Sequence, residues 1–385
     1  RFDPSAPSWP NRDRFVLSGG HGSMLLYALL HLVGYDLSLD ELKEFRQWGS
    51  RTPGHPEYGL TPGIEATTGP LGQGFGNAVG MAIAEAHLSS LFNRPGYDLI
   101  DHHTYAIVTD GDLMEGVASE AASLAGHLKL GKLIFLYDDN RITIDGSTDL
   151  SFTEDRAARF RAYGWQILNV TDGNNVRSVD LAIQKAKKDP RPSLIICRTQ
   201  IGYGLPTRQG TAKAHGEPPG EEEIAAAKSA ADWSEEPFHV PQDVRELFQA
   251  VAAKGKKQRE NWLRLLSTYK IAEPQLHSEL LRRFDGSLPE NWEQALPAFP
   301  ADPIGMATRA ASGKTLNALA GLVPELMGGS ADLTPSNNTW INNDHPFQFD
   351  KHDGRYIHFG VREHAMGAIV NGLALHGGLI PFGAT

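Results

Sequence analysis

Two polar side chains, Asp110 and Asn140, each follow an apolar stretch of the sequence and together could hold a divalent cation. Asp110 ends Ile107-Val-Thr-Asp110, and Asn140 stands 30 residues further on, after Tyr137-Asp-Asp. If both stretches are neighbouring strands of a parallel sheet, their carboxyl ends line one crevice. Mg²⁺ and Ca²⁺ prefer carboxylate, amide and carbonyl oxygens and share phosphate oxygens with a substrate. The spacing fits a cation that holds a diphosphate, while two ordinary strand-end turns would use the same residue types.

Three histidines lie in loops rich in glycine or proline, where an imidazole can reach a ligand and exchange protons near neutral pH. They are His21 in Ser18-Gly-Gly-His21-Gly22, His55 in Thr52-Pro-Gly-His55-Pro56, and His215 in Lys213-Ala-His215-Gly216. Any one of them alone is more often a solvated loop residue. Without cysteine companions or a His-x₃-His spacing, the three argue against zinc and favour a polar ligand cleft.

Glu363 stands at the start of a nearly apolar segment that predicts a helix, in Gly360-Val-Arg-Glu363-His-Ala-Met-Gly367. A glutamate at a helix N-terminus usually interacts with the helix dipole and has no further role. If it faced an apolar cleft instead, burial would raise its pKa and let it donate a proton. The residues alone leave both interpretations open.

Two segments resemble nucleotide-binding loops but depart from them. In Gly72-Gln-Gly74-Phe-Gly76-Asn-Ala-Val79 a valine stands where the third glycine of a dinucleotide loop is needed, and no clean strand precedes the segment. Gly313-Lys-Thr315 lacks the first glycine of a P-loop, because Thr308 takes its place. We therefore exclude NAD at the first segment and a nucleoside triphosphate at the second.

The elements that must position these residues alternate between strands and helices, which predicts an α/β fold with a doubly wound, mostly parallel sheet. Expected strands are 105–109, 133–138, 166–170 and 193–199. Expected helices are 74–92, 114–130 and 178–188, with Gly131 as the C-cap of the second. The fold class predicted from this order is a βαβαβ arrangement.

Composition divides the chain into three regions, because charges and prolines replace apolar strands from about residue 221 to residue 300. The domain limits that we expect are 1–240 for the first α/β domain and 241–302 for a helical linker, where the limit at 240 comes from the family resemblance described below. Residues 303–385 begin a second α/β domain, with helices at 306–322 and 363–376, strands at 326–331 and 356–360, and a final apolar strand. Because the chain opens without Met and ends in that strand, we expect both ends to be cut and the second domain to be incomplete.

Composition excludes several classes of protein. The 385 residues include 36 Lys+Arg and 46 Asp+Glu, giving a formal charge of −10, so binding to a nucleic-acid backbone is a poor starting hypothesis. No apolar run is long enough to span a membrane, which predicts a soluble protein. The single Cys197, in an apolar run, predicts a small buried side chain, and its lack of a partner fits a cytoplasmic location.

The ordered motifs along the chain strongly resemble transketolases, a family of thiamine diphosphate enzymes. The matching segments are residues 13–22, 49–57, 68–74, 110–116, 123–128, 137–140, 328–337 and 359–367. The resemblance implies a diphosphate-binding domain, a linker and the opening part of a pyrimidine-binding domain. The missing parts would be the family's first helix, before Arg1, and everything after Thr385.

The resemblance also implies roles for individual residues. It makes Asp110, Asn140 and the Ile142 carbonyl the ligands of Mg²⁺ or Ca²⁺. It assigns cofactor contacts to His21, Gly69, Leu71, Gly111, Asn140, His215, Asp332 and Glu363. Substrate contacts fall to His55, His215, Arg309 and Ser336, of which the last two would grip a sugar phosphate. Catalytic roles fall to Glu363, His55 and His215.

By the same resemblance, Glu363 protonates the aminopyrimidine ring of thiamine diphosphate in the partner subunit, so a homodimer with active sites at its interface is expected. Glu115 and Glu120 match acidic interface positions. The implied reaction moves a two-carbon ketol unit from a ketose phosphate to an aldose phosphate in the pentose phosphate pathway. No nucleic acid or membrane partner is expected.

Several alternatives stay open. A dihydroxyacetone synthase shares these motifs and would accept formaldehyde. An inactive truncated chain, or half of a split enzyme, would explain the abrupt end, although natural breaks fall in exposed linkers. One departure from the family pattern concerns the metal motif, where Thr109 replaces the usual first glycine.

Overall fold

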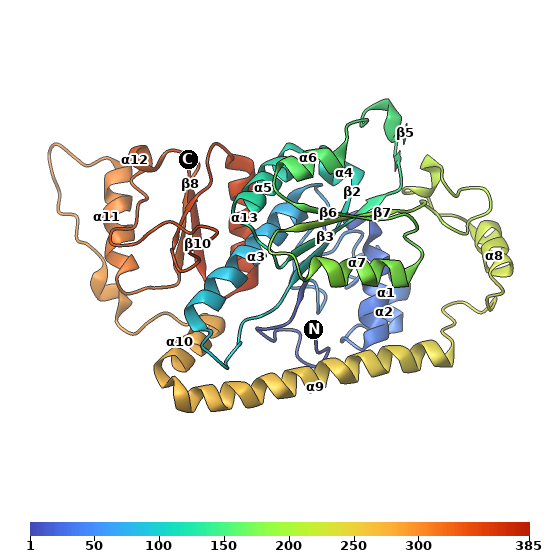
Figure 1. The fold of residues 1–385 in the computed structure, drawn as a ribbon, viewed down its shortest axis with the longest axis horizontal. Coiled ribbons are helices and arrows are strands. Elements are labelled where there is room, and N and C mark those ends of the chain that lie inside the picture. Colours follow the sequence, from blue (N-terminus) through green and yellow to red (C-terminus); the bar gives the residue numbers. More distant parts are fainter.

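The four apolar runs expected as strands pair into one parallel sheet, and a fifth strand joins them at its edge. A computed structural model describes residues 1–385 (Figure 1). The strand order is β1-β2-β3-β7-β6, and every pairing is parallel. The strands are β1 Arg14–Leu17, β2 Thr104–Thr109, β3 Leu133–Asp139, β6 Gln166–Val170 and β7 Ser193–Arg198. The predicted parallel α/β sheet is confirmed, with strand ends within a residue or two of those expected.

Alternation along the strands places apolar side chains on both faces of this sheet. On β3, Leu133, Phe135 and Tyr137 pack into the main core, whereas Ile134 joins a separate cluster on the other face. The helices that cover the main-core face are α3 Gln73–Phe92, α5 Gly116–His127 and α6 Arg156–Ala162. The opposite face is covered by α1 Ser23–Val33 and α7 Val176–Ala186. Helices on both faces make the sheet doubly wound, as predicted.

The edge strand β1 was not foreseen from the sequence. It has four residues, and its Arg14 is almost fully buried. That guanidinium forms an ion pair with Glu65 at 3.1 Å and donates to the carbonyl of His376 at 3.1 Å. A buried arginine is tolerated when it is paired and hydrogen-bonded in this way. The partners that make the strand possible lie far away in sequence.

The helix expected over 114–130 is wrong in its bounds and in its cap. The structure has α4 Asp110–Met114 and α5 Gly116–His127, separated at Glu115, whose ψ of 136° is extended. Leu128 caps α5, and Lys129 takes the left-handed turn with φ 50°. Gly131 does not cap the helix. It allows close packing against the segment at Pro190, because a Cβ on Gly131 would lie 2.8 Å from the Pro190 carbonyl.

The linker region is dominated by one long helix that runs along one side of the molecule (Figure 1). The helices of this region are α8 Glu221–Ala230, α9 Gln242–Ala272 and α10 Pro274–Asp285. Prolines fit both ends of α9, since Pro241 is its N-cap and Pro274 starts α10. No helix in the structure combines the length and the apolar character that crossing a membrane requires.

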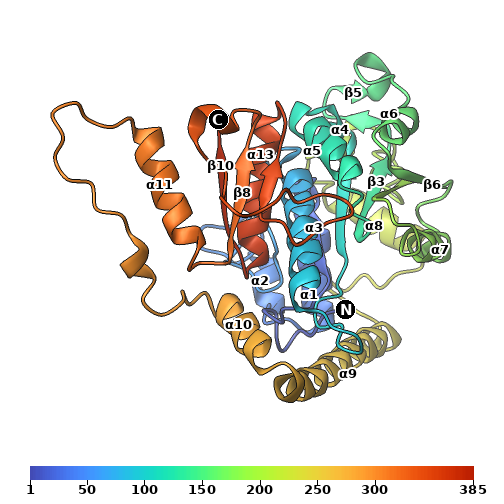
Figure 2. The ribbon, with the colours of Figure 1, turned by 60° about the vertical axis from the view of Figure 1, so that its left-hand side comes forward.

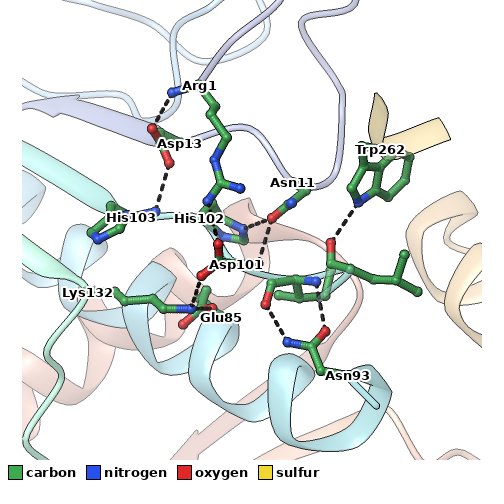
Figure 3. A network of polar contacts seen from close by, with 12 residues as sticks. Arg1, Asn11, Asp13, Glu85, Asn93, Asp101, His102, His103, Lys132 and Trp262 are labelled. Atoms are coloured by element: carbon green, nitrogen blue, oxygen red, sulfur yellow. Dashed lines mark hydrogen bonds and ion pairs between the residues drawn. The ribbon is translucent and has the colours of Figure 1, made fainter. Parts of the chain in front are cut away.

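A group of polar contacts lies at the amino-terminal edge of the first sheet, and one of them reaches α9 (Figure 3). The Trp262 ring N–H donates to the Leu99 carbonyl at 2.8 Å. Nearby, the Lys132 ammonium lies 2.7 Å from a Glu85 oxygen and 2.8 Å from an Asp101 oxygen. Burial raises the pKa of Glu85 to about 7. This network stabilises the edge opposite the strand ends that carry the predicted site.

The second sheet is parallel, with strand order β10-β8-β9, and packs beside the first domain through α13 (Figure 2). Its elements are α11 Thr308–Ala320, β8 Leu326–Ser330, α12 Thr334–Asn337, β9 Tyr356–His358, α13 Glu363–His376 and β10 Ile380–Ala384. The helices α13 and α3 can approach closely because Gly80 of α3 has no side chain. A Cβ at this position would lie 2.1 Å from the Ile369 carbonyl oxygen. The second predicted α/β unit is present.

The remaining elements are short. They are α2 Leu39–Lys43, the hairpin strands β4 Ile142–Thr143 and β5 Gly146–Ser147, and four 3₁₀ turns at Gly20–Gly22, Thr148–Leu150, Ala212–Ala214 and Trp292–Ala295.

Candidate active site

The predicted cation ligands lie at the carboxyl-terminal edge of the first sheet. Thr109 of β2 pairs in register with Asp138 of β3, so Asp110 and Asn140 follow neighbouring strand ends. Asp110 opens α4 directly after β2, and Asn140 directly follows β3, which ends at Asp139. The sheet topology therefore brings the two residues to one edge, as the sequence indicated.

Asp110 has a buried carboxylate with one free oxygen. Only 3% of the residue is exposed. Its Oδ1 accepts a hydrogen bond from the Tyr137 hydroxyl, whereas its Oδ2 is buried without a partner. Burial raises the pKa of Asp110 to about 6. An unpaired buried oxygen of this kind is costly unless a cation or donor completes it, so Oδ2 suits a metal ligand.

Asn140 and Ile142 sit on one tight turn. The Asn140 Oδ1 accepts from the Ile142 backbone N–H at 2.9 Å, and its amide donates to Asp138 at 3.0 Å. Between them Arg141 adopts φ 63°. An amide oxygen has a second lone pair, so Asn140 keeps one for a cation. The structure contains no group of three or more His, Cys, Asp or Glu residues that could hold a metal, so a cation here would need the amide and carbonyl oxygens as well.

The three loop histidines come together, although they are up to 194 positions apart in the sequence. The His21 ring lies 5.0 Å from that of His55 and 5.6 Å from that of His215, measured between centroids. Burial, and then the neighbouring His215, lowers the pKa of His21. Burial, and then His21, lowers the pKa of His55. Both imidazoles are therefore mostly neutral near pH 7 and can donate or accept a hydrogen bond.

Glycines let the loops around the histidines approach closely. A Cβ on Gly20 would lie 2.9 Å from the Gly69 nitrogen, and one on Gly69 would lie 3.2 Å from the His55 ring. Similarly, a Cβ on Gly111 would lie 2.7 Å from the Leu71 side chain. The predicted cofactor residues Gly69, Leu71 and Gly111 are thus in contact with their neighbouring loops.

The predicted residues of the second domain are exposed and form no such cluster. Arg309 lies on α11, Ser336 on α12, Glu363 opens α13, and Asp332 has φ 62° just before α12. The helices that carry Arg309 and Ser336, α11 and α12, are neighbours. A Cβ on Gly313 of α11 would lie 2.6 Å from the carbonyl oxygen of Asn338, which follows α12. The single chain does not bring these residues into contact with the histidines.

The start of α13 is held by the first domain, but the Glu363 side chain is not. The Ala365 N–H donates to the Glu120 carboxylate at 2.9 Å, and Arg362 donates to the Ser123 hydroxyl at 3.1 Å. Glu363 itself makes no side-chain hydrogen bond or ion pair and faces outward. Glu120 therefore has a partner within the chain, and the interface role expected for it and Glu115 stays a prediction.

Three further residues border the site and were not predicted from the sequence. Tyr137 donates to Asp110, and Arg46 lies near enough to His21 and His55 to lower the pKa of both. The third, Asp112, is fully buried beneath the loops. Only Asp112 carried a signal: Thr109 and Asp112 are spaced as a capping box, which the structure shows at the start of α4. Thr109, the departure from the family pattern, thus caps this helix.

Two family models cover most of the chain. Residues 1–289 match the model described as transketolase, thiamine diphosphate binding domain, and residues 304–385 match that of the transketolase pyrimidine binding domain. The expected domain limits at 240 and 302 stay a prediction.

Curated relatives match across the whole chain. A transketolase of Geobacillus stearothermophilus is 56% identical over 386 residues, covering 100% of this chain and 58% of the relative. One of Bacillus subtilis is 52% identical over 385 residues, with 99% and 58% coverage. The chain thus spans less than two thirds of the length of these relatives.

Solved structures of transketolases also match the whole chain. Transketolase from Leishmania mexicana superposes with a TM-score of 0.97 at 50% identity, over 100% of this chain and 57% of that one. A Pichia stipitis transketolase in complex with sedoheptulose 7-phosphate gives a TM-score of 0.98 at 48% identity, over 100% and 58%.

Proposed function

The chain belongs to the transketolase family, and we propose that it carries the cofactor-binding half of a ketol-transferring active site. Two observations carry this proposal: the buried Oδ2 of Asp110 has no partner, and the rings of the three histidines cluster. The proposed reaction transfers a two-carbon ketol unit between sugar phosphates, as in the pentose phosphate pathway. We propose a cytoplasmic location on the same family basis.

The residues present fit thiamine diphosphate with a divalent cation. A diphosphate needs a cation and neutral or positive donors, and this edge offers Asp110, Asn140 and the Ile142 carbonyl for Mg²⁺ or Ca²⁺. His21 and His215, with ring centroids 5.6 Å apart, would donate to the diphosphate oxygens. The close-packed Gly69, Leu71 and Gly111 would present backbone to the cofactor.

When bound, thiamine diphosphate supplies a nucleophilic carbon and an electron sink for the two-carbon unit. The chain's own residues bind, orient and move protons around it. His55 is mostly neutral because burial lowers its pKa, so it can accept a proton from a sugar hydroxyl or donate a hydrogen bond to it. Glu363 would hold a proton at the aminopyrimidine ring of a cofactor bound to a second subunit.

The exposed Glu363 supports a homodimer. Glu363 is exposed at the start of an apolar helix and makes no side-chain hydrogen bond or ion pair within residues 1–385, so it is available to a surface brought by a second subunit. Two-fold symmetry would then use the same pair of surfaces twice and form two sites. Each site would combine Asp110 and the histidines of one subunit with Glu363 of the other.

Arg309 and Ser336 support sugar phosphates as substrates, because guanidinium and hydroxyl groups bind phosphate oxygens well. Transketolases of Pichia stipitis have been solved in complex with xylulose-5-phosphate, sedoheptulose 7-phosphate and fructose 6-phosphate. We propose the same class of substrate for this protein.

Calorimetric titration of the full chain with thiamine diphosphate, with and without Mg²⁺, tests the proposal. We expect binding that requires the cation, and transfer of a ketol unit from xylulose 5-phosphate to ribose 5-phosphate. Absence of cation-dependent binding would contradict the proposed function. Formaldehyde as the preferred acceptor would identify a dihydroxyacetone synthase instead.

A further inference from the structure

The Asp112 carboxylate is fully buried and accepts four hydrogen bonds. Its Oδ1 accepts from the Ser18 hydroxyl at 2.6 Å and from the Gly72 N–H at 2.8 Å. Its Oδ2 accepts from the Thr109 N–H at 2.9 Å and from the Thr109 hydroxyl at 3.0 Å. Each oxygen of this buried carboxylate is therefore satisfied by two donors. One side chain is therefore the shared acceptor of three separate segments.

Each of these segments leads into a part of the candidate site. Ser18 directly follows β1 and begins the loop that carries His21. Gly72 closes the loop that carries Gly69 and Leu71. Thr109 ends β2 immediately before Asp110. No other side chain forms hydrogen bonds to all three segments.

We propose that Asp112 is the positioning residue of the cofactor site: it fixes the histidine loop, the glycine loop and the cation-ligand turn relative to one another. This inference rests on the proposed function, because it assumes that these loops bind thiamine diphosphate and a cation. Asp112 lies beneath the loops and acts through them, and it touches neither substrate nor cofactor.

The packing around this carboxylate shows why the separation of the loops depends on it. A Cβ on Gly19 would lie 2.5 Å from the Thr109 methyl group, and one on Gly74 would lie 2.7 Å from the Ser18 Cα. The loops are thus in direct van der Waals contact with one another, and each of them also donates a hydrogen bond to the buried Asp112 carboxylate. A change in either component moves several site residues at once, and sub-ångström errors matter in a binding site.

Asp112→Asn tests the proposal with little change in volume. The amide keeps one acceptor oxygen but turns its NH₂ group toward two of the present donors, so at least one backbone N–H is left unpaired. We expect the affinity of the full chain for thiamine diphosphate with Mg²⁺ to fall on the order of 10- to 100-fold, as when outer-shell partners of metal ligands are changed. At saturating cofactor, kcat should return to within about threefold of wild type, because the reacting groups are untouched.

The matched control is Asp155→Asn, since Asp155 also accepts a backbone N–H at a helix start, 2.9 Å from Ala158, but lies outside the site. We expect its cofactor affinity to be unchanged. Thr109→Val and Ser18→Ala each remove one donor with little change of shape, and each should weaken cofactor binding less than Asp112→Asn. Combined with Asp112→Asn, Ser18→Ala should have a smaller effect than alone, because its partner is already altered.

The outcomes separate this inference from the proposed function. If the wild-type chain binds no thiamine diphosphate, the proposed function is wrong. If wild type binds but Asp112→Asn, Thr109→Val and Ser18→Ala all bind equally well, Asp112 does not position the site. A fall in the melting temperature of Asp112→Asn with unchanged affinity well below that temperature would show a role in folding only, and would also overturn the inference. If Asp112→Asn does not fold, the two single-donor variants decide.

Discussion

The two domains present their predicted site residues in opposite ways. In the first, Asp110 is buried and the rings of His21, His55 and His215 lie within 5.6 Å of a neighbour. In the second, Glu363 is exposed and has no side-chain partner. The first set is assembled by one chain, through loops that share hydrogen bonds. The second set is placed on a surface that nothing in the chain covers.

Under the proposed function, this difference would assign cofactor binding to one subunit and proton donation to the other. A diphosphate and a cation need several ligands at fixed positions, which neighbouring strand ends of one sheet supply. A proton donor to the distant ring of the cofactor needs only one carboxylate, which a second subunit can bring on a helix end. The following predictions test this division, in order of decreasing effect.

Glu363→Gln should produce the largest loss. The amide cannot hold the transferred proton, so kcat should fall on the order of 10²–10⁴-fold. Because the side chain is exposed, the stability should change by no more than about 0.5 kcal/mol. Steady-state kinetics and thermal melting check both expectations. Glu222→Gln, on the exposed face of α8, is the control and should change neither. A large loss of stability in Glu363→Gln would show that the carboxylate has a structural partner.

Asp110→Asn should weaken cation-dependent cofactor binding by about 100-fold or more, because a charged ligand is lost. In the cation-free protein the same change should be stabilising. The pKa of Asp110 is raised to about 6, above the unfolded value of 3.8, so its contribution to stability is lost as pH rises through about 6. At pH 7.5 the variant should therefore be more stable by on the order of 1 to 3 kcal/mol.

Calorimetry and chemical unfolding of Asp110→Asn measure the two effects. Asp139→Asn is the control, since Asp139 is a neighbouring carboxylate that pairs with Arg156 at 3.4 Å and is not a predicted ligand. Equal loss of cofactor affinity in both variants would contradict a specific role for Asp110.

Arg309→Leu should raise KM for a sugar phosphate by roughly 10- to 100-fold, the cost of a lost charged hydrogen bond. Cofactor affinity should stay the same, because Arg309 lies on the exposed face of the second domain. Comparing a phosphorylated substrate with its unphosphorylated sugar separates the effects, since only the phosphorylated one should lose affinity. Equal losses for both would show that Arg309 does not bind phosphate.

Tyr137→Phe should have the smallest effect, a loss of about 10-fold in cation affinity at neutral pH. The Tyr137 hydroxyl donates to Asp110 and favours the ionised carboxylate, opposing the effect of burial on its pKa. A cation binds the ionised form, so affinity should fall as pH drops through about 6 in wild type. In Tyr137→Phe the midpoint should lie at higher pH. An unchanged midpoint would contradict this role.

Much of the fold could be predicted from local patterns. The strands β2, β3, β6 and β7 are apolar runs that end in turn residues, and α13 begins and ends where its apolar segment does. The edge strand β1 could not be recognised, because its buried Arg14 is stabilised by the distant Glu65 and by a carbonyl of α13. The end of α5 was placed too late because Lys129, rather than glycine, adopts the left-handed turn.

The site shows the same limit. Asp110 and Asn140 could be placed at one edge because strand ends in a parallel sheet share an edge. Resemblance supplied the roles of the histidines, but their mutual distances depend on the paths of two long segments with little regular structure, residues 44–72 and 199–220. Asp112 was overlooked because a carboxylate two positions after Asp110 has many ordinary uses. Only the structure shows its contacts with Ser18 and Gly72.

The most direct test of the central claim, that each site combines two subunits, is to mix two inactive full-chain variants. Asp110→Asn lacks the first half of a site and Glu363→Gln lacks the second. In a mixed dimer one site carries both changes and the other carries neither, so after subunit exchange roughly a quarter of wild-type activity should return. If no activity returns although mixed dimers form, Asp110 and Glu363 serve the same chain's site, and the account is wrong.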